Sequence, residues 1–468
     1  MSRLTLTGAG GGGVDPDILF FEVDTTQSGS ASDTFVIPAT GSVTYDVDWG
    51  DGSTDTGVSG SQTKVYSSSG TYEIKISNPS GAFDPLRLNN SGDKSKLTDI
   101  KQWGVVEWTT LGSAFRDCTN MDISATDAPD TSNVTDFAYA WLGCTGLTSF
   151  PILNCAAATT FNYTWSGCTG LTSFPLLTNT SLVTNWTRAW NDCTGLTSFP
   201  LLDSSVGTVF TATWNGCTDL TSFPLMDFTA ATSMINTWSS CTSLTSFPLI
   251  VIPALTGFSQ TWYNCTSMTS FPLIDTSAIT SFGYAWTSCS SLTSFPLIDT
   301  SAGTAFTYTW SGCTSLTSFP LLDFTAATSL IRTWQGCSGL TSFPLIVVPV
   351  CTSFFVTWYG CTGLTSFPLI VFSGVTTFGY TWYNCTGLNA YDFPLINMHA
   401  MTSGGFCFYG VTLSTTSYSN LLINIEANNS NSTVTFHGGN SLYNVAGGVA
   451  RADLIADHTW TITDGGAA

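Results

Sequence analysis

The chain has 468 residues, of which 43% are hydrophobic, enough for a large core, but only 9% are charged. Its 31 acidic residues outnumber 11 basic ones and give a formal net charge of −20, which argues against binding to nucleic acids or anionic membranes. No stretch of about 18 apolar residues occurs, so the sequence predicts no membrane-spanning helix.

Residues 1–16 form a glycine-rich leader. Its run GAGGGG lacks the Lys-Ser/Thr ending of a phosphate-binding loop. No apolar run in it is long enough for a secretory signal, which favours a protein made in the cytosol. We expect a flexible segment that docks the protein onto a larger assembly.

Residues 17–80 are predicted to form a small all-β domain. Apolar and polar residues alternate in VTYDVDW, residues 43–49, and in TYEIKI, residues 71–76, as in half-buried strands. The Asp51-Gly52 pair supplies a tight turn between strands.

This domain resembles the PKD-type β-sandwich in the turn Trp-Gly-Asp-Gly, residues 49–52, and in the later Tyr66, Gly70 and Tyr72. The resemblance implies a spacer or an adhesive module. Asp46, Asp48 and Asp51 are candidate calcium ligands, although exposed strand and turn carboxylates are the interpretation that we prefer.

A cysteine recurs at intervals of 26, 24 and 25 residues and then of 24 throughout. Zinc ligands lie two to four residues apart, so this spacing predicts no metal site. Parallel side chains fit disulfide geometry poorly, and we predict a ladder of buried, reduced core thiols. The repeat position holds Cys118 and Cys144, followed by the ladder Cys168, Cys193, Cys217, Cys241, Cys265, Cys289, Cys313, Cys337, Cys361 and Cys385.

Apolar residues precede each cysteine by 10, 7 and 3 positions, as in Val183, Trp186 and Trp190 before Cys193. That spacing predicts one face of a short helix, with the aromatic residues in the core. The position two before each Trp should then point outward. As a surface-contact row we select Tyr163, Arg188, Tyr284, Tyr308, Arg332 and Tyr380; Ala212, Asn236, Gln260 and Val356 share this position.

The motif LTSFPL follows each helix and carries Leu171, Phe174 and Leu176 in one repeat. It matches the L-x-x-L-x-L pattern of leucine-rich repeats, whose second half forms one rung of a parallel sheet. Proline interrupts the rung, so short strands are expected. About 12 such repeats over residues 81–410 predict an α/β solenoid.

Residues 96–121, KLTDIKQWGVVEWTTLGSAFRDCTNM, and the following DAPDTSNVTDFAYAWLGCTGLTSFP resemble the BspA-type leucine-rich repeat surface proteins. Trp replaces the Phe of that family's Met-Phe pair here. The resemblance implies the solenoid fold and an adhesive role, without a shared catalytic residue.

Residues 411–468 are predicted to form an α/β cap that covers the end of the solenoid. We expect helices in 417–429 and 447–458 and strands in 432–439 and 459–466. The ending ARADLIADHTWTITDGG is similar to C-termini of repeat proteins of bacteriophage virions.

A hydrolase triad is a weak alternative in this cap. His437 and His458 lie near Ser441, Asp453 and Asp457, but nothing forms a nucleophile elbow. We interpret both histidines as structural.

The sequence therefore predicts a non-enzymatic protein without a cofactor. The leading hypothesis is a virion appendage, a phage tail or head fibre assembled in the host cytoplasm, which binds other virion proteins through its N-terminal region. Its partner would be a glycan or protein of the host surface, with no nucleic acid and no membrane insertion; association with further copies stays open. The alternatives are a BspA-like bacterial surface adhesin and a glycan- or ice-binding solenoid that uses the Thr172 row.

Overall fold

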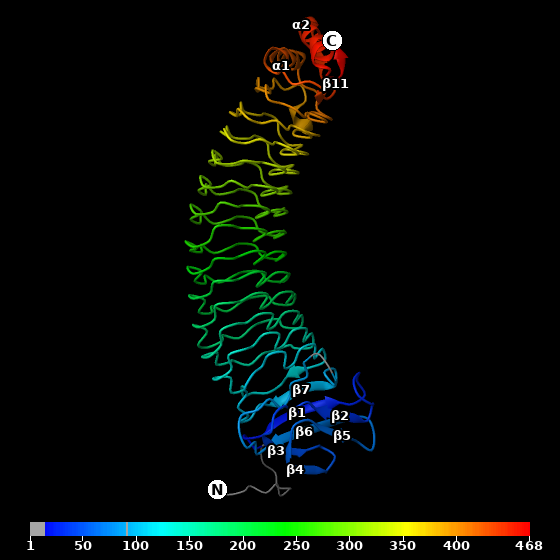
Figure 1. Cartoon of the computed structure of the whole chain (residues 1–468), viewed down its shortest axis with the longest axis vertical. Coiled ribbons are helices and arrows are strands. Elements are labelled where there is room, and N and C mark those ends of the chain that lie inside the picture. The colour runs from blue at the N-terminus through cyan, green and yellow to red at the C-terminus, as the bar shows by residue number, and fades with distance from the viewer. Residues whose placement is uncertain (1–14, 90–91) are drawn as a thin grey trace. The chain divides into compact units, whose positions relative to one another are not determined.

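The computed structural model describes residues 15–89 and 92–468 and divides into two compact units (Figure 1). The first comprises the described parts of Met1–Ala158 together with Pro175–Asn179. The second comprises Thr159–Phe174 and Thr180–Ala468. The leader expected at residues 1–16 lies almost wholly outside the described residues.

The first unit contains a six-stranded sheet of order β4-β3-β6-β1-β7-β8, antiparallel except for the parallel pair β7–β8. A separate antiparallel pair joins β2 and β5. The strands are β1 (Leu19–Asp24), β2 (Thr34–Ile37), β3 (Thr44–Asp48), β4 (Thr54–Ser59), β5 (Gln62–Val65), β6 (Thr71–Ser77), β7 (Leu97–Gln102) and β8 (Asp122–Ile123).

The alternating residues of these strands form the core of the first unit. Phe21 of β1 and Phe35 of β2 are fully buried, with ring centroids 6.2 Å apart, and Ile74 and Ile76 of β6 lie in the same core. The sheet does not end at residue 80, where we placed the domain boundary. Strand β7 pairs with β1 and carries the sheet into the segment assigned to the repeats.

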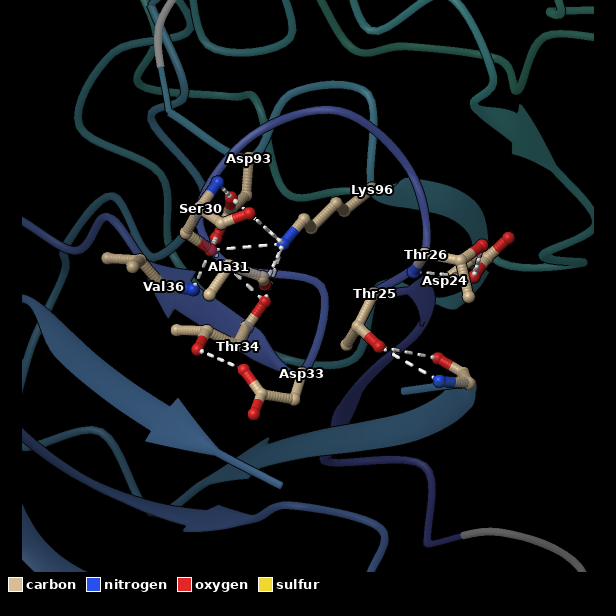
Figure 2. A network of polar contacts seen from close by, with 11 residues as sticks. Asp24, Thr25, Thr26, Ser30, Ala31, Asp33, Thr34, Val36, Asp93 and Lys96 are labelled. Atoms are coloured by element: carbon tan, nitrogen blue, oxygen red, sulfur yellow. Dashed lines mark hydrogen bonds and ion pairs between the residues drawn. The ribbon is translucent and has the colours of Figure 1, made fainter. Parts of the chain in front are cut away.

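A buried ion pair between Lys96 and Asp93 stabilises the loop between β1 and β2 (Figure 2). Lys96 and Asp93 are fully buried, with Nζ 3.6 Å from Oδ1. The Lys96 ammonium group donates to the carbonyls of Ala31 and Thr34, both at 2.8 Å. Asp93 accepts from the Ser30 N–H at 2.6 Å, so both charges are satisfied by hydrogen bonds as well as by each other.

The second unit consists largely of stacked coils of about 24 residues (Figure 1). Alternate N–H groups take different partners. Those of Trp186, Arg188 and Trp190 donate to carbonyls of the next coil at 2.8 to 2.9 Å. Those of Ala189 and Cys193 donate to carbonyls three residues earlier and close turns.

The prediction of a short helix in each repeat is therefore wrong. An α-helix sends each N–H to the carbonyl four residues earlier, whereas every second donor here leaves the coil. Arg188 and Asp192 also have positive φ angles of 52° and 57°, which interrupt a right-handed helix. Two successive turns produce the apolar spacing that we took for a helix face.

The parallel rung predicted at LTSFPL is also not a strand. Most parallel bridges between coils lie eight residues before the cysteine, as in Ser281 with Ala305, and a few lie just after the motif, as in Val347 with Val371. In the motif itself proline has no N–H to donate. Leu176, which we expected in the rung, is 53% exposed, and the following Leu177 is buried instead.

Aromatic columns fill the core of the coils. Trp214 lies on Trp238 with ring centroids 5.7 Å apart and planes 5° from parallel. Phe223 meets Trp214 edge-to-face at 4.7 Å. The column runs through Trp165, Trp190, Trp214, Trp238, Trp262, Trp286, Trp310, Trp334, Trp358 and Trp382.

The structure places the ladder cysteines beside this column, buried and free, as are all 15 cysteines of the chain. The Cys313 thiol donates to the Trp286 carbonyl of the preceding coil at 3.2 Å. Burial raises the pKa of the thiols to about 12 at Cys193, Cys241, Cys289, Cys337 and Cys385.

The C-terminal cap belongs to the second unit. The 3-10 turn Thr386–Leu388 precedes it; the cap has α1 (Thr415–Asn428), β9 (Thr435–His437), β10 (Leu442–Tyr443), α2 (Val445–His458), β11 (Thr461–Thr463) and β12 (Gly466–Ala467). Strand β9 pairs in parallel with β11, and β10 with β12. Gly404 donates to Thr435, so β9 continues the coil-to-coil bonding into the cap. Among the described helices, neither is long and apolar enough to cross a membrane.

Replacing Lys96 by Met should destabilise the first unit by about 3–5 kcal/mol, because Asp93 is left as an unpaired buried charge. Hydrogen exchange of β1 and β2 in the full chain measures the loss. Lys101→Met is the control, since Lys101 pairs with Glu22 and Glu73 at the surface, where about 1 kcal/mol or less is expected. Equal losses in both variants would contradict the role given to the buried pair.

Unfolding at pH 10.5 should release thiol protons. The unfolded thiols ionise near pH 9, whereas the folded ones keep their protons to about pH 12, so stability from this source is complete below pH 9 and is lost as pH rises toward 12. Replacing Cys241, Cys289 and Cys337 by Ala should lower the protons released in a pH-stat urea titration by about three. An unchanged proton count would show that these thiols are ionised in the folded chain.

Candidate binding surface

The surface-contact row occupies a strained backbone position. From Tyr163 to Tyr380 every residue two before a Trp of the column has a positive φ, between 52° at Arg188 and 61° at Val356. Residues other than glycine lose about 1–2 kcal/mol there. The prediction that this position points outward is wrong for Ala212 and Val356, which are 4% and 5% exposed.

Three members of the row form one cluster. The rings of Tyr284 and Tyr308 are stacked with centroids 4.6 Å apart. The Arg332 guanidinium lies over Tyr308, 5.1 Å from the ring centroid, and donates to the Tyr308 hydroxyl. The stack of coils thus turns three residues spaced 24 apart into one continuous side-chain surface.

The other three members lie apart from that cluster. Arg188 is exposed and lies over Tyr163, 5.3 Å from its ring centroid. Tyr380 stacks on Phe406 at 4.9 Å. The row is therefore a series of local clusters, because small or aliphatic residues such as Ala212 and Val356 interrupt it.

A second row of tyrosines was missed in the sequence. Tyr359 and Tyr383 each follow a Trp of the column by one residue, and Tyr409 follows Phe408, which stacks on Trp382. The three tyrosine rings stack at 4.6 and 4.7 Å. His437 of the cap packs against Tyr409 at 5.4 Å. The repeated Trp-Tyr pair in WYGC and WYNC was the available signal. Both rows together are called the tyrosine face below.

The stacking determines what this face can bind. Both faces of Tyr308 are covered, by the Tyr284 ring and the Arg332 guanidinium group, and both faces of Tyr383 by the rings of Tyr359 and Tyr409, so these inner rings offer a ligand their edges and hydroxyls. Loss of hydration among the rings raises the pKa of Tyr383, and Tyr359 and Tyr409 add to the shift. The Tyr383 hydroxyl therefore stays protonated and can both donate and accept hydrogen bonds.

The candidate calcium ligands do not converge. Asp46 accepts from the Gly57 N–H at 2.7 Å and from Asn78 at 2.8 Å. Asp51 instead pairs with Lys64 at 2.7 Å, which holds its pKa at about 2. The lysine occupies the side of Asp51 that a cation would need.

The candidate hydrolase residues are also engaged separately. His437 Nδ1 accepts from the Gly439 N–H at 3.1 Å, and Ser441 Oγ accepts from the Leu413 N–H at 2.8 Å. Desolvation lowers the pKa of His437. No hydrogen bond between His437 and Ser441 is present among the described residues.

Within residues 15–89 and 92–468, no group of three or more His, Cys, Asp or Glu side chains could hold a metal ion. No family model, no curated protein and no solved structure matches this chain. The resemblances to the PKD-type and BspA-type proteins and to virion repeat proteins therefore stay predictions.

Proposed function

We propose that this chain is a structural, adhesive protein, a bacteriophage tail or head fibre that contacts the host cell surface through its tyrosine face. One observation carries the adhesive part: coil stacking aligns Tyr284, Tyr308 and Arg332 into one surface on a backbone held by coil-to-coil hydrogen bonds. Tyrosine side chains have only two χ angles and lose little conformational entropy on binding, and tyrosine and arginine are enriched among the residues that dominate binding energy.

The chemistry of this face favours a hydroxyl-rich ligand. Its tyrosine rings present edges and protonated hydroxyls, and Arg332 adds a cation in a chain of net charge −20. A host glycan or a polar protein loop offers the matching donors and acceptors. Flat stacking of a sugar on a ring face is the mode that this geometry does not favour within the rows.

The virion assignment rests on the C-terminal resemblance and on the many free cysteines, which are compatible with assembly in the cytosol, and the rival is a bacterial surface adhesin. An antibody against residues 411–468 separates the two on particles and cells of the source organism. We expect label on virions in electron micrographs. Label confined to the cell envelope would leave the adhesin as the function.

Replacing Tyr284 and Tyr308 by Ala should weaken binding of the purified chain to host cells by about tenfold or more, because two central ring contacts are lost. The backbone tolerates Ala at this position, where Ala212 occurs naturally with φ 53°. Cell-binding isotherms measure the effect, with Gln260→Ala in the same row as a control. Equal binding by all three chains would remove the tyrosine face from the adhesive surface.

A further inference from the structure

One exposed leucine recurs on every coil of the second unit from residue 201 to residue 395. These residues lie eight positions after the ladder cysteine, or ten in the last coil, and are 51% to 62% exposed. The set is called the leucine ridge: Leu201, Leu225, Leu249, Leu273, Leu297, Leu321, Leu345, Leu369 and Leu395.

The preceding proline explains why these leucines face outward. The Met226 N–H donates to the Pro224 carbonyl at 3.0 Å, and Ile274 and Pro272 form the same bond at 3.1 Å. This three-residue turn places Leu225 at its apex and returns Met226, 2% exposed, to the core. The exposure is thus built into the repeat.

The leucine ridge and the tyrosine face lie on opposite sides of the core. Trp214, two residues after the tyrosine-face position, meets Phe223, two residues before Leu225, edge-to-face in the core at 4.7 Å. The backbone segments that carry these rings therefore flank the core. A partner on the ridge would leave the tyrosine face free.

The area of the ridge matches what a stable pair requires. A CH2 group corresponds to roughly 30 Å² of accessible surface, so the nine leucines offer roughly 600 Å². Exposed Val251, Val347 and Val371 and the half-buried prolines extend it. The total approaches the ~800 Å² that each partner contributes to a standard interface.

We propose that the leucine ridge pairs two copies of this chain, side by side and running in the same direction. Leucines one coil apart recur with the ~4.8 Å spacing of paired strands. A partner with the same repeat can meet all of them at once, and a second copy has that repeat.

The acidic residues beside the leucine ridge favour the parallel over the antiparallel direction of pairing. In eight of the nine coils Thr and Ser precede the leucine, as Thr293 and Ser294 precede Leu297, and in five coils an exposed acid such as Asp299 follows it. A two-fold axis along the stack places the acidic row of one copy opposite the Thr and Ser rows of the other, whose hydroxyls can donate to carboxylates. The antiparallel arrangement places acid opposite acid, which is unfavourable.

The test measures the mass of the full chain by sedimentation equilibrium. We expect a dimer at micromolar concentration. Leu225→Lys, Leu273→Lys and Leu321→Lys combined should weaken pairing by about 100-fold or more, because three buried charges face their own copies. The control combines Thr232→Lys, Thr280→Lys and Thr328→Lys, which adds the same charge to an exposed row elsewhere on the coils and should stay dimeric.

Direction is tested by single cysteines, since all native thiols are buried. In a parallel pair, Leu225→Cys alone and Leu369→Cys alone, second from either end of the leucine ridge, should each form a disulfide-linked dimer on mild oxidation. In an antiparallel pair only a mixture of the two variants would be linked, which would overturn the direction.

Other results would overturn the pairing itself. These are a monomeric wild-type chain, a trimer, or a leucine variant that pairs as well as its control while its tryptophan near-ultraviolet circular dichroism is unchanged. A monomer that floats with phosphatidylcholine vesicles only when the ridge is intact would assign the ridge to a membrane.

Discussion

The stacked coils of the second unit depend on an alternation of hydrogen-bond acceptors among the backbone N–H groups. In the segment around each Trp, every second donor bonds to the next coil and the donors between them close local turns. The buried backbone N–H groups of this segment thus find acceptors without a helix or a continuous strand. Because equivalent residues are bonded coil to coil, the sequence repeat becomes a spatial column of identical side chains.

The aromatic columns stabilise the coils through ring burial and stacking, but the repeat also carries destabilising features. Stacked indoles gain apolar burial and ring contacts, and Trp214 touches both Trp238 and Phe223. Against this, the indole N–H groups of the column from Trp190 to Trp382 have no hydrogen-bond partner among the described residues, whereas that of Trp186 donates to the Val183 carbonyl at 3.1 Å. Non-glycine residues at positive φ, such as Gln260, add a further cost in each coil. Because these costs recur in every coil, the free energy gained from burying and stacking the rings must also recur in every coil. This requirement favours a strict sequence repeat.

The two exposed surfaces follow from the same coil. The left-handed position before the Trp brings side chains such as Tyr308 and Arg332 against their equivalents one coil away. The proline turn on the other side of the core projects Leu225 and its equivalents into solvent. A surface for a foreign partner and a surface for a second copy can therefore be used together.

The sequence by itself determined the period, the stacked cysteines and aromatic residues, and the two helices of the cap, because burial of an apolar residue at a fixed interval leaves a direct trace in the sequence pattern. It did not determine the backbone of the repeat: a 3, 4, 3 spacing fits a helix face and two successive turns equally well. The tertiary structure decided between them, since the N–H of Trp190 finds its acceptor 23 residues away, in Thr213. The second tyrosine row and the extension of the first sheet through β7 were decided in the same way, by partners distant in the chain.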